Sequence, residues 1–557
     1  MFPNRPLGPA LVAAAGLLLA TGCAPEARLT DNGDTVVFHQ QQEPDALNPY
    51  ISEMMATIDA TAPIIEGLTA VNDQLETVPV LAETFPTVEN GLVKTDGKKM
   101  IVTYPLRKGV KWHDGQPFTA EDVKFTFEMI MHPRTMVTSR QGYEKIEKVE
   151  VVDAHTVRMT YKEVYAPYYD RFSAILPKHL LAKELEDPKG DSINKSAYNR
   201  HPVGTGPYKF KSWTSGDHIA FTAFDDYWRG KPKIQNLKMR IVPDENAAFT
   251  LLKSGELDIY QSADISKFEA VKKLGHVDVV AQPALTWELL GLNVDRPHLS
   301  DIRVRRAIAH SINKKQISEK IYQGLYPPAY SDQTPLSWAY NKKIENYYPY
   351  DPEKAKALLD EAGWKPGLDG IRTKDGDRLS LKITTVAGRK ARELTELVMK
   401  YYFKKVGIEL VIDNVPGTIL FGPYPGGTLK GGKFDLGMWA WVAGVDPDNN
   451  SLWHSSQIAG KGNNGQNSTR FRNAEMDKLL VEGTQVLEQK KRAAIYKRTA
   501  EILAEQVPII PLLYWANINP VNKRLKNFKP NPSNQGNLWN CYEWEIAPTS
   551  AIKASKE

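Results

Sequence analysis

The chain has 557 residues, of which 42% are apolar and 25% charged, and its formal net charge is +5 at pH 7. This length exceeds what one hydrophobic core supports, so we expect two or three lobes. The composition is typical of a globular protein. The small net charge, with Lys and Arg scattered along the chain, argues against nucleic-acid binding.

The N-terminal segment has the pattern of an export signal. An apolar run from Ala10 to Ala20 follows the positively charged Arg5 and is too short to span a membrane. It ends in Leu-Ala-Thr-Gly-Cys at 19–23, which resembles a lipobox. We therefore expect residues 1–22 to be a lipoprotein signal peptide. An ordinary secretory signal with an incidental cysteine is the alternative.

Cleavage before Cys23 would leave its thiol for lipid attachment, with the polar residues 23–33 as a tether to the folded body. The only other cysteine is Cys541. An internal disulfide is not expected, because Cys541 has no partner once Cys23 is lipidated.

The first half of the chain alternates predicted strands and helices. Thr119 and Asp122 have the spacing of a capping box, which predicts the start of a helix. The Asp114-Gly115 pair predicts a turn, and we place His113 at its surface rather than in a catalytic site. The expected elements are strands 35–40, 98–107, 149–152, 156–161 and 234–242, and helices 60–68, 119–130 and 245–252.

In the second half, the stretch from Thr286 to Ile317 predicts a buried strand up to Val294, followed by an amphipathic helix. Ser300 is the expected N-cap, and Asp301 places a negative charge in the first turn. The other expected elements are strands 379–386, 408–411, 434–442 and 507–514, and helices 352–362, 392–403, 474–486 and 489–503.

Four of these segments carry a resemblance to a known family. They are Thr286–Ile317 with its Arg-Arg-Ala-Ile helix, Leu106–Ile130 (LRKGVKWHDGQPFTAEDVKFTFEMI), Gly204–Phe210 (GTGPYKF) and Asp351–Trp364 (DPEKAKALLDEAGW). Their order and spacing resemble those of the family 5 extracellular solute-binding proteins. These are the peptide, oligosaccharide and nickel receptors of ABC importers.

The resemblance implies an α/β architecture, the type II fold of periplasmic-binding-protein-like molecules. Two lobes would surround a cleft, and a third domain would extend one of them. The implied division is lobe I from 34–69, 204–289 and 515–557, the additional domain from 70–203, and lobe II from 290–514. The chain would cross between these units near residues 70, 203, 290 and 515, which could act as a hinge.

The strand and loop from Phe434 to Trp453 form the richest candidate recognition segment. Trp439 and Trp441 lie two apart on the predicted strand, so both point to one face. That face could stack on a sugar, cover a peptide or fill a core. We expect both indoles to face the ligand.

Asp446 is the candidate anchor for a ligand's ammonium group. In peptide-binding relatives an aspartate follows the tryptophan by three residues, and here that position is Gly444. The anchor is then either shifted to Asp446 or missing. Asp446 could equally just cap the Asp-Pro turn.

Family position also places Glu43, Asn48, Arg389 and Tyr424 near the cleft. Arg389 could accept a ligand carboxylate in a bidentate contact. Each of these residues could instead be a solvated or supporting residue.

The sequence has no Gly-x-Ser-x-Gly, His-Glu-x-x-His or P-loop motif, so we expect neither an enzyme nor a cofactor or metal site. The resemblance implies an exported, membrane-anchored lipoprotein at the cell surface or in the periplasm. As a monomer, it would capture peptides and deliver them to ABC permease subunits. The alternatives are an oligosaccharide receptor of the same fold, and an exported chaperone or sensor.

Overall fold

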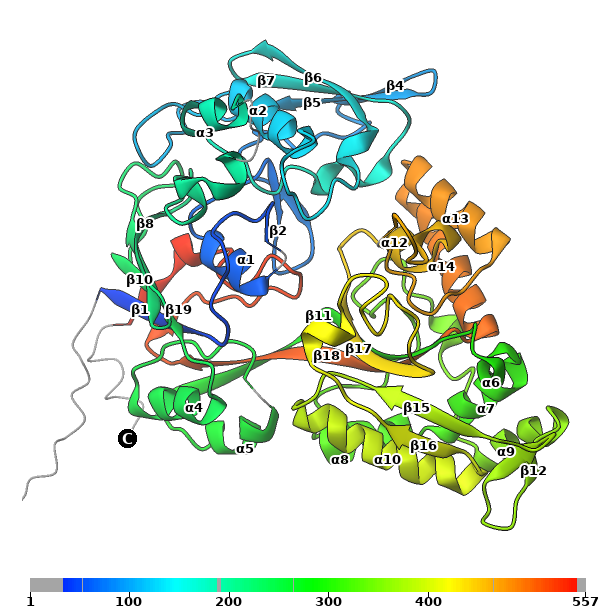
Figure 1. The fold of residues 1–557 in the computed structure, drawn as a ribbon. Coiled ribbons are helices and arrows are strands. Elements are labelled where there is room, and N and C mark those ends of the chain that lie inside the picture. Colours follow the sequence, from blue (N-terminus) through cyan, green and yellow to red (C-terminus); the bar gives the residue numbers. More distant parts are fainter. Residues whose placement is uncertain (1–33, 53, 188–191, 264, 464, 548–557) are drawn as a thin grey trace, which may run out of the picture.

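The computed structural model describes residues 34–547, except 53, 188–191, 264 and 464. The predicted signal peptide, the tether and Cys23 lie outside the described residues. The chain forms three bodies (Figure 1). The cyan part of the chain lies at the top, the N- and C-terminal segments at the left, and the yellow and orange segments at the right.

Lobe I is built on a four-stranded sheet in the order β1-β10-β9-β8. β1 is parallel to β10, while the other neighbours are antiparallel. The strands and helices are β1 (Thr35–Gln40), β8 (Tyr208–Thr214), β9 (His218–Ala223), β10 (Asn236–Ile241), α1 (Met55–Thr61), α4 (Glu245–Ser254) and α5 (Phe268–Val271). The helix expected at 60–68 instead ends at Thr61, because Pro63 cannot donate a helical hydrogen bond.

The additional domain contains the antiparallel sheet β4-β5-β7-β6. Its elements are β2 (Thr69–Val71), β3 (Thr77–Pro79), β4 (Val93–Asp96), β5 (Lys99–Pro105), β6 (Ile146–Asp153), β7 (Thr156–Tyr161), α2 (Ala120–Met131) and α3 (Lys178–Leu185). The predicted capping box between Thr119 and Asp122 is confirmed. The strands expected at 149–152 and 156–161 are present as the antiparallel pair β6 and β7.

His113 corrects a prediction, because it is buried rather than at the surface of its turn. Its Nε2 contacts the carbonyl of Gly206 at 2.9 Å, and its Nδ1 accepts from the Gly204 amide at 3.2 Å. Burial lowers the pKa of His113 to about 4. A Cβ at Gly204 would lie 1.8 Å from the Ile64 carbonyl, so glycine is required there. His113 thus ties the additional domain to lobe I as a neutral structural side chain.

Lobe II is built on a five-stranded sheet in the order β16-β15-β17-β11-β18. Its strands are β11 (Val277–Leu292), β15 (Ser380–Thr384), β16 (Glu409–Ile412), β17 (Leu436–Val442) and β18 (Ile509–Asn522), with the short β12 (Lys365–Pro366), β13 (Arg372–Lys374) and β14 (Asp377–Arg378) beside it. The small pair β19 (Leu525–Lys526) and β20 (Glu545–Ile546) follows in the C-terminal segment.

Helices cover the lobe II sheet. They are α6 (Pro297–Ser300), α7 (Ile302–Ser311), α8 (Lys314–Ile321), α9 (Pro352–Glu361), α10 (Lys390–Val406), α11 (Gly417–Leu420), α12 (Asn450–Trp453), α13 (Ala474–Gln485) and α14 (Gln489–Gln506). The N-cap of α7 is Asp301, not Ser300, because the Asp301 carboxylate accepts from the Arg303 amide at 2.8 Å. Ser300 ends the preceding turn of helix.

Two long strands, β11 and β18, run antiparallel between the lobes (Figure 1). Near lobe I, Ile259 bridges both to Phe38 of β1 and to Val521 of β18. At the other end, β11 pairs with β17 inside the lobe II sheet. The register of the long pair shifts between Pro283 and Trp287, where the strands leave one lobe for the other. This irregular segment is where bending would disturb the fewest ladder hydrogen bonds.

Candidate functional site

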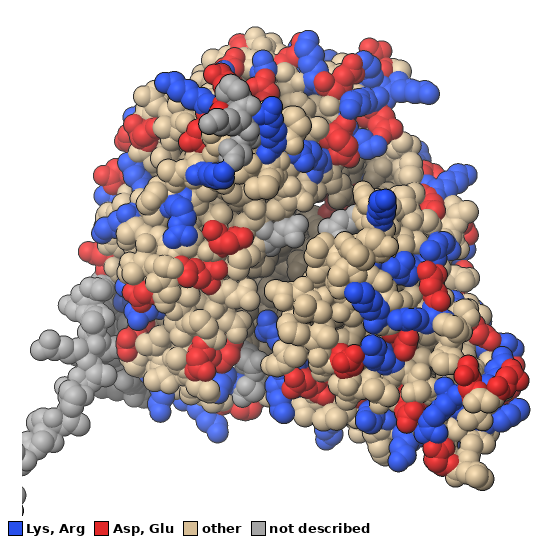
Figure 2. All heavy atoms as spheres, viewed as in Figure 1, with Lys and Arg blue, Asp and Glu red and all other residues tan. Residues whose placement is uncertain are grey.

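A cavity of about 330 Å³ lies between the lobes, beside the long strand pair. Figure 2 shows the hollow that separates the two halves of the surface. This volume falls within the range of about 300–1,000 Å³ that is usual for small-molecule pockets. The lining is rich in amide side chains: Gln40, Gln41, Gln42, Gln261, Asn517, Asn531, Asn534 and Asn537.

The lobe I wall carries two acidic side chains. Asp59 of α1 accepts a hydrogen bond from Gln40 at 2.8 Å. Glu245, the first residue of α4, accepts from Gln41 at 3.0 Å and from the hydroxyl of Tyr260. The amides of the glutamines therefore fix both carboxylates at the edge of the cavity.

On the lobe II wall lies Arg389, the one Lys or Arg among the described residues that line the cavity. It precedes α10, and its side chain is exposed. Within the described part of the chain, no ion pair or hydrogen bond engages its guanidinium. Its neighbour Arg392 is different, since it forms a buried ion pair with Glu288 at 2.8 Å. The prediction that Arg389 lies near the cleft agrees with its position, and its role as a ligand contact stays a prediction.

Trp439 and Trp441 do not line this cavity, so the prediction that both indoles face a ligand there is wrong. Ala440 and Val442 of β17 line the cavity, so Trp439 and Trp441 project from the other face of that strand. Trp439 is 6% exposed and packs over Gly291, where a Cβ would lie 2.3 Å from the indole. Trp441 is half-buried against the same apolar core. The sequence correctly placed both indoles on one face, but that face belongs to the core.

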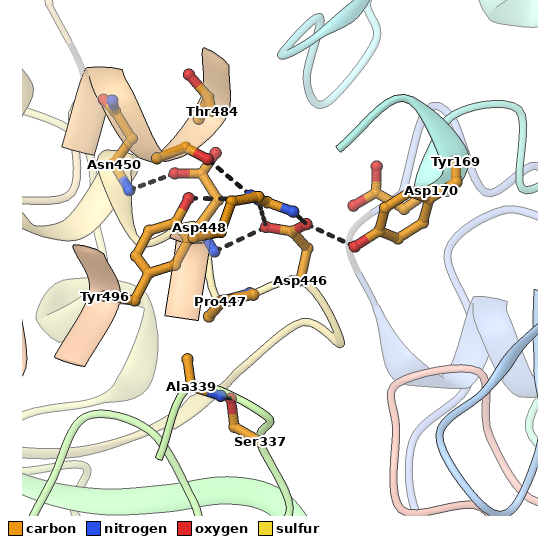
Figure 3. Close-up of polar contacts among 12 residues, drawn as sticks. Tyr169, Asp170, Ser337, Ala339, Asp446, Pro447, Asp448, Asn450, Thr484 and Tyr496 are labelled. Atoms are coloured by element: carbon orange, nitrogen blue, oxygen red, sulfur yellow. Dashed lines mark hydrogen bonds and ion pairs between the residues drawn. The ribbon is translucent and has the colours of Figure 1, made fainter. Parts of the chain in front are cut away.

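Asp446 lies in the loop after β17 and does not line this cavity; Figure 3 shows its contacts. Both of its oxygens accept from Arg492 of α14 at 2.7 Å, and the two side chains are each 3% exposed. A third donor is the hydroxyl of Tyr169, at 2.6 Å. The charge that we expected to hold a ligand's ammonium group is thus already neutralised inside the protein.

The Tyr169–Asp446 contact joins the additional domain to lobe II across the cleft (Figure 3). A second link runs from Gln485 at the end of α13 to Glu163, at 3.1 Å. Next to these links is a polar cavity of about 760 Å³ between the additional domain and lobe II. These two contacts therefore join the additional domain to lobe II. We call them the latch.

The other predicted site residues do not line this cavity. Glu43 accepts from Trp213 and Ser215, both at 2.8 Å. Asn48 is buried and donates to Asn199 at 3.0 Å. Neither lines the cavity between the lobes. Tyr424 is exposed in the loop after α11 and is also absent from the cavity wall.

Sequence reasoning missed Asp59, Tyr169 and Arg492. The helix that carries Asp59 was predicted to begin five residues too late. Asp59 therefore fell outside the predicted helix, and its position after a cleft loop was not recognised. Tyr169 and Arg492 acquire their roles only through contacts far along the chain, so spacing could not have found them.

Two further observations concern the described residues alone. No group of three or more His, Cys, Asp or Glu side chains among them could hold a metal ion. None of the helices in the described ranges is long and apolar enough to cross a membrane.

Two lobes joined by long strands, with a cavity between them that is lined by many side-chain amides, have the architecture of a solute-binding protein. Residues 76–463 match the model of the bacterial extracellular solute-binding proteins, family 5. This match covers more than half of the chain, and the protein belongs to that family. The members of the family are solute-binding proteins rather than enzymes.

Among its relatives is the oligopeptide-binding protein AppA of Bacillus subtilis, 30% identical over 521 residues, which are 92% of each chain. The structure of AppA in complex with a nonapeptide superposes with a TM-score of 0.77, covering 93% of this chain and 99% of that one. NikZ of Campylobacter jejuni, in complex with Ni(L-His), has a TM-score of 0.79 at 28% identity and covers 92% and 99%.

Proposed function

We propose that the protein is the substrate-binding component of an ABC importer and captures peptides in the cavity between the lobes. The observation that carries this proposal is the Arg389 guanidinium, which pairs with no residue that the structure describes and lines the same cavity as many side-chain amides. A peptide offers the two complements to such a lining: main-chain N–H and C=O groups for the amides and a terminal carboxylate for the arginine. The peptide ligands of AppA and other relatives agree with this assignment.

Delivery of the ligand to the permease would follow from closure of the cleft. Ligand that touches both walls binds the closed form better than the open form, so it shifts the population towards closure. The closed form would then dock on the permease subunits. The protein would act as a monomer, because one chain supplies both walls of the cavity.

The oligosaccharide alternative rested on two indoles forming a stacking platform and on the absence of an aspartate at position 444. Trp439 is part of the core, which weakens the first of these two grounds. Nothing in the cavity lining selects a chaperone or sensor role over capture of a solute.

The test is calorimetric titration with a library of di- to pentapeptides, next to a set of β-linked oligosaccharides. We expect a peptide to bind and the radius of gyration to fall at saturation. Arg389→Gln should lose about 2–5 kcal/mol of affinity for that peptide, but little for its C-terminal amide. Sugar binding without peptide binding would overturn the proposal.

We also propose that the protein is exported and anchored by a lipid on Cys23. The support is the lipobox-like sequence at 19–23 after a short apolar run. Two acyl chains on one residue give stable anchoring, at about 0.8 kcal/mol per buried methylene. In cell fractionation, Cys23→Ser should move the protein from the membrane to the soluble fraction. A variant as firmly membrane-bound as the wild type would contradict the anchor.

A further inference from the structure

Asp59 is the acidic side chain of the cavity that retains an unused oxygen. It is 7% exposed, and its Oδ2 accepts from Gln40 at 2.8 Å. No hydrogen bond or ion pair reaches its Oδ1 from any residue that the structure describes. Glu245, by contrast, has a donor on each oxygen, Gln41 on one and Tyr260 on the other.

The surroundings of Asp59 leave its Oδ1 free. Gly536, which also lines the cavity, approaches so closely that a Cβ there would lie 2.5 Å from that oxygen. Gly536 also has φ +77°, a conformation that favours glycine. A larger residue at this position would cover the oxygen. The glycine therefore keeps a buried carboxylate oxygen accessible from the cavity.

Charge is divided between the two walls. Asp59 and Glu245 belong to lobe I, and Arg389 belongs to lobe II. Asp446, the acid nearest to the position of the family's ammonium anchor, is neutralised by Arg492. A peptide with a free amino terminus still requires a carboxylate, because an unpaired ammonium in a closed cavity is costly.

We propose that Asp59 of lobe I binds the ligand's terminal ammonium group while Arg389 of lobe II binds its terminal carboxylate. The ligand is then a short zwitterionic peptide that lies across the cavity and touches both lobes with its charged ends. This inference rests on the proposed peptide-binding function. It adds to that function a requirement for a free amino terminus and names the residue that enforces it.

The ionisation of Asp59 offers a way to measure its proposed contact with the ligand's ammonium group. Burial raises its pKa to about 7, although the hydrogen bond from Gln40 opposes the shift. An ammonium beside the carboxylate favours the charged form, so binding at pH 6–7 should release a proton. The other titratable side chains among the described residues of the cavity lining are His39, whose pKa burial lowers, Glu245 and Arg389.

The experiment compares a peptide found in the library with its N-acetyl form, on wild type and on Asp59→Asn. We expect the wild type to prefer the free peptide by about 30-fold or more, as for removal of one partner of a buried charge pair. Asp59→Asn keeps the shape and should bind both forms alike. Glu66→Gln is the matched control. Glu66 is a buried carboxyl of lobe I with donors from Thr205, Tyr227 and Trp228, and it does not line this cavity.

A second measurement needs only the wild type, in case Asp59→Asn does not fold. Titrations at pH 6 in buffers of different ionisation enthalpy should show proton release with the free peptide and none with the acetylated one. Equal affinity of the wild type for both forms would overturn the inference and leave the proposed function standing, as would unchanged discrimination in Asp59→Asn. Absence of binding by any peptide would instead overturn the proposed function, and the inference with it.

Discussion

Arg492 holds Asp446 in a bidentate ion pair, with both nitrogen–oxygen distances at 2.7 Å and both side chains 3% exposed. The third guanidinium nitrogen of Arg492 donates to the Gly483 carbonyl at 2.7 Å. The pair joins the loop after β17 to α14 and presents its acid to Tyr169 of the additional domain. It therefore supports the latch of the cleft and leaves Asp446 without a free charge for a ligand.

Asp446→Asn should destabilise the protein strongly, because it leaves the Arg492 guanidinium buried without a counter-charge. Breaking a buried pair on one side costs about 3–5 kcal/mol. Urea unfolding followed by circular dichroism measures this. The double variant Asp446→Asn/Arg492→Met should recover part of the loss. A single variant within about 1 kcal/mol of wild type would mean that the pair contributes little.

Local signals in the sequence predicted the elements well. The strand at 35–40, the capping box of Thr119 and Asp122, and the helix beginning at Gln489 match the structure because their determinants lie within a few residues. The site was predicted less well. The side-chain alternation of β17 was right, but which of its faces meets the cavity depends on how the lobe II sheet packs.

The partners of Asp446 show the same limit. Arg492 lies 46 residues away along the chain and Tyr169 lies 277 away. No pattern of spacing connects such residues. Arg389 was placed near the cleft only through the resemblance to a family, and its lack of an internal partner became visible in the structure.

Trp439 should behave as a core residue. Trp439→Ala removes an indole that packs over Gly291 and beside Phe434, so we expect a loss of about 3–5 kcal/mol in the free energy of unfolding. Trp441→Ala, at a half-buried position on the same face, should cost less. Denaturant unfolding gives both values, and peptide titration gives the affinities. A Trp439 variant of normal stability but weak affinity would return this residue to the ligand site.

Tyr169→Phe should loosen the latch without unfolding either lobe. It removes the hydroxyl that donates to Asp446 at 2.6 Å, and hydrogen bonds to charged groups contribute about 1.5–3 kcal/mol. Because this bond joins the two sides of the cleft, its loss should appear as weaker ligand affinity and a larger radius of gyration without ligand.

The neighbouring Tyr168 is the control for the latch. Its hydroxyl donates to the Pro86 carbonyl at 2.7 Å, inside the additional domain. Tyr168→Phe removes the same atom one residue away, yet it should leave the radius of gyration and the affinity unchanged. If the two variants behaved alike in scattering and titration, the Tyr169 hydroxyl would not be holding the cleft shut.

Asp448 should make stability depend on pH. Burial and the nearby Asp446 raise the pKa of Asp448 to about 7, whereas an unfolded aspartate titrates near 3.9. Between these values the folded protein binds the extra proton, so this group's contribution to stability is fully present below about pH 4 and is lost as pH rises through 7. Because Asp448 is half-buried, we expect the loss to be about 1 kcal/mol.

Asp448→Asn isolates that contribution. The asparagine oxygen can still accept from the Asn450 amide, which the Asp448 carboxylate does at 3.0 Å, so the loop keeps its hydrogen bond. The variant should match the wild type near pH 4.5 and be more stable by about 1 kcal/mol at pH 8, where the wild-type carboxylate is charged next to Asp446. Urea unfolding at the two pH values measures the difference. A variant that is less stable than wild type at pH 8 would show that the charge of Asp448 is stabilised by Arg492 rather than penalised by burial.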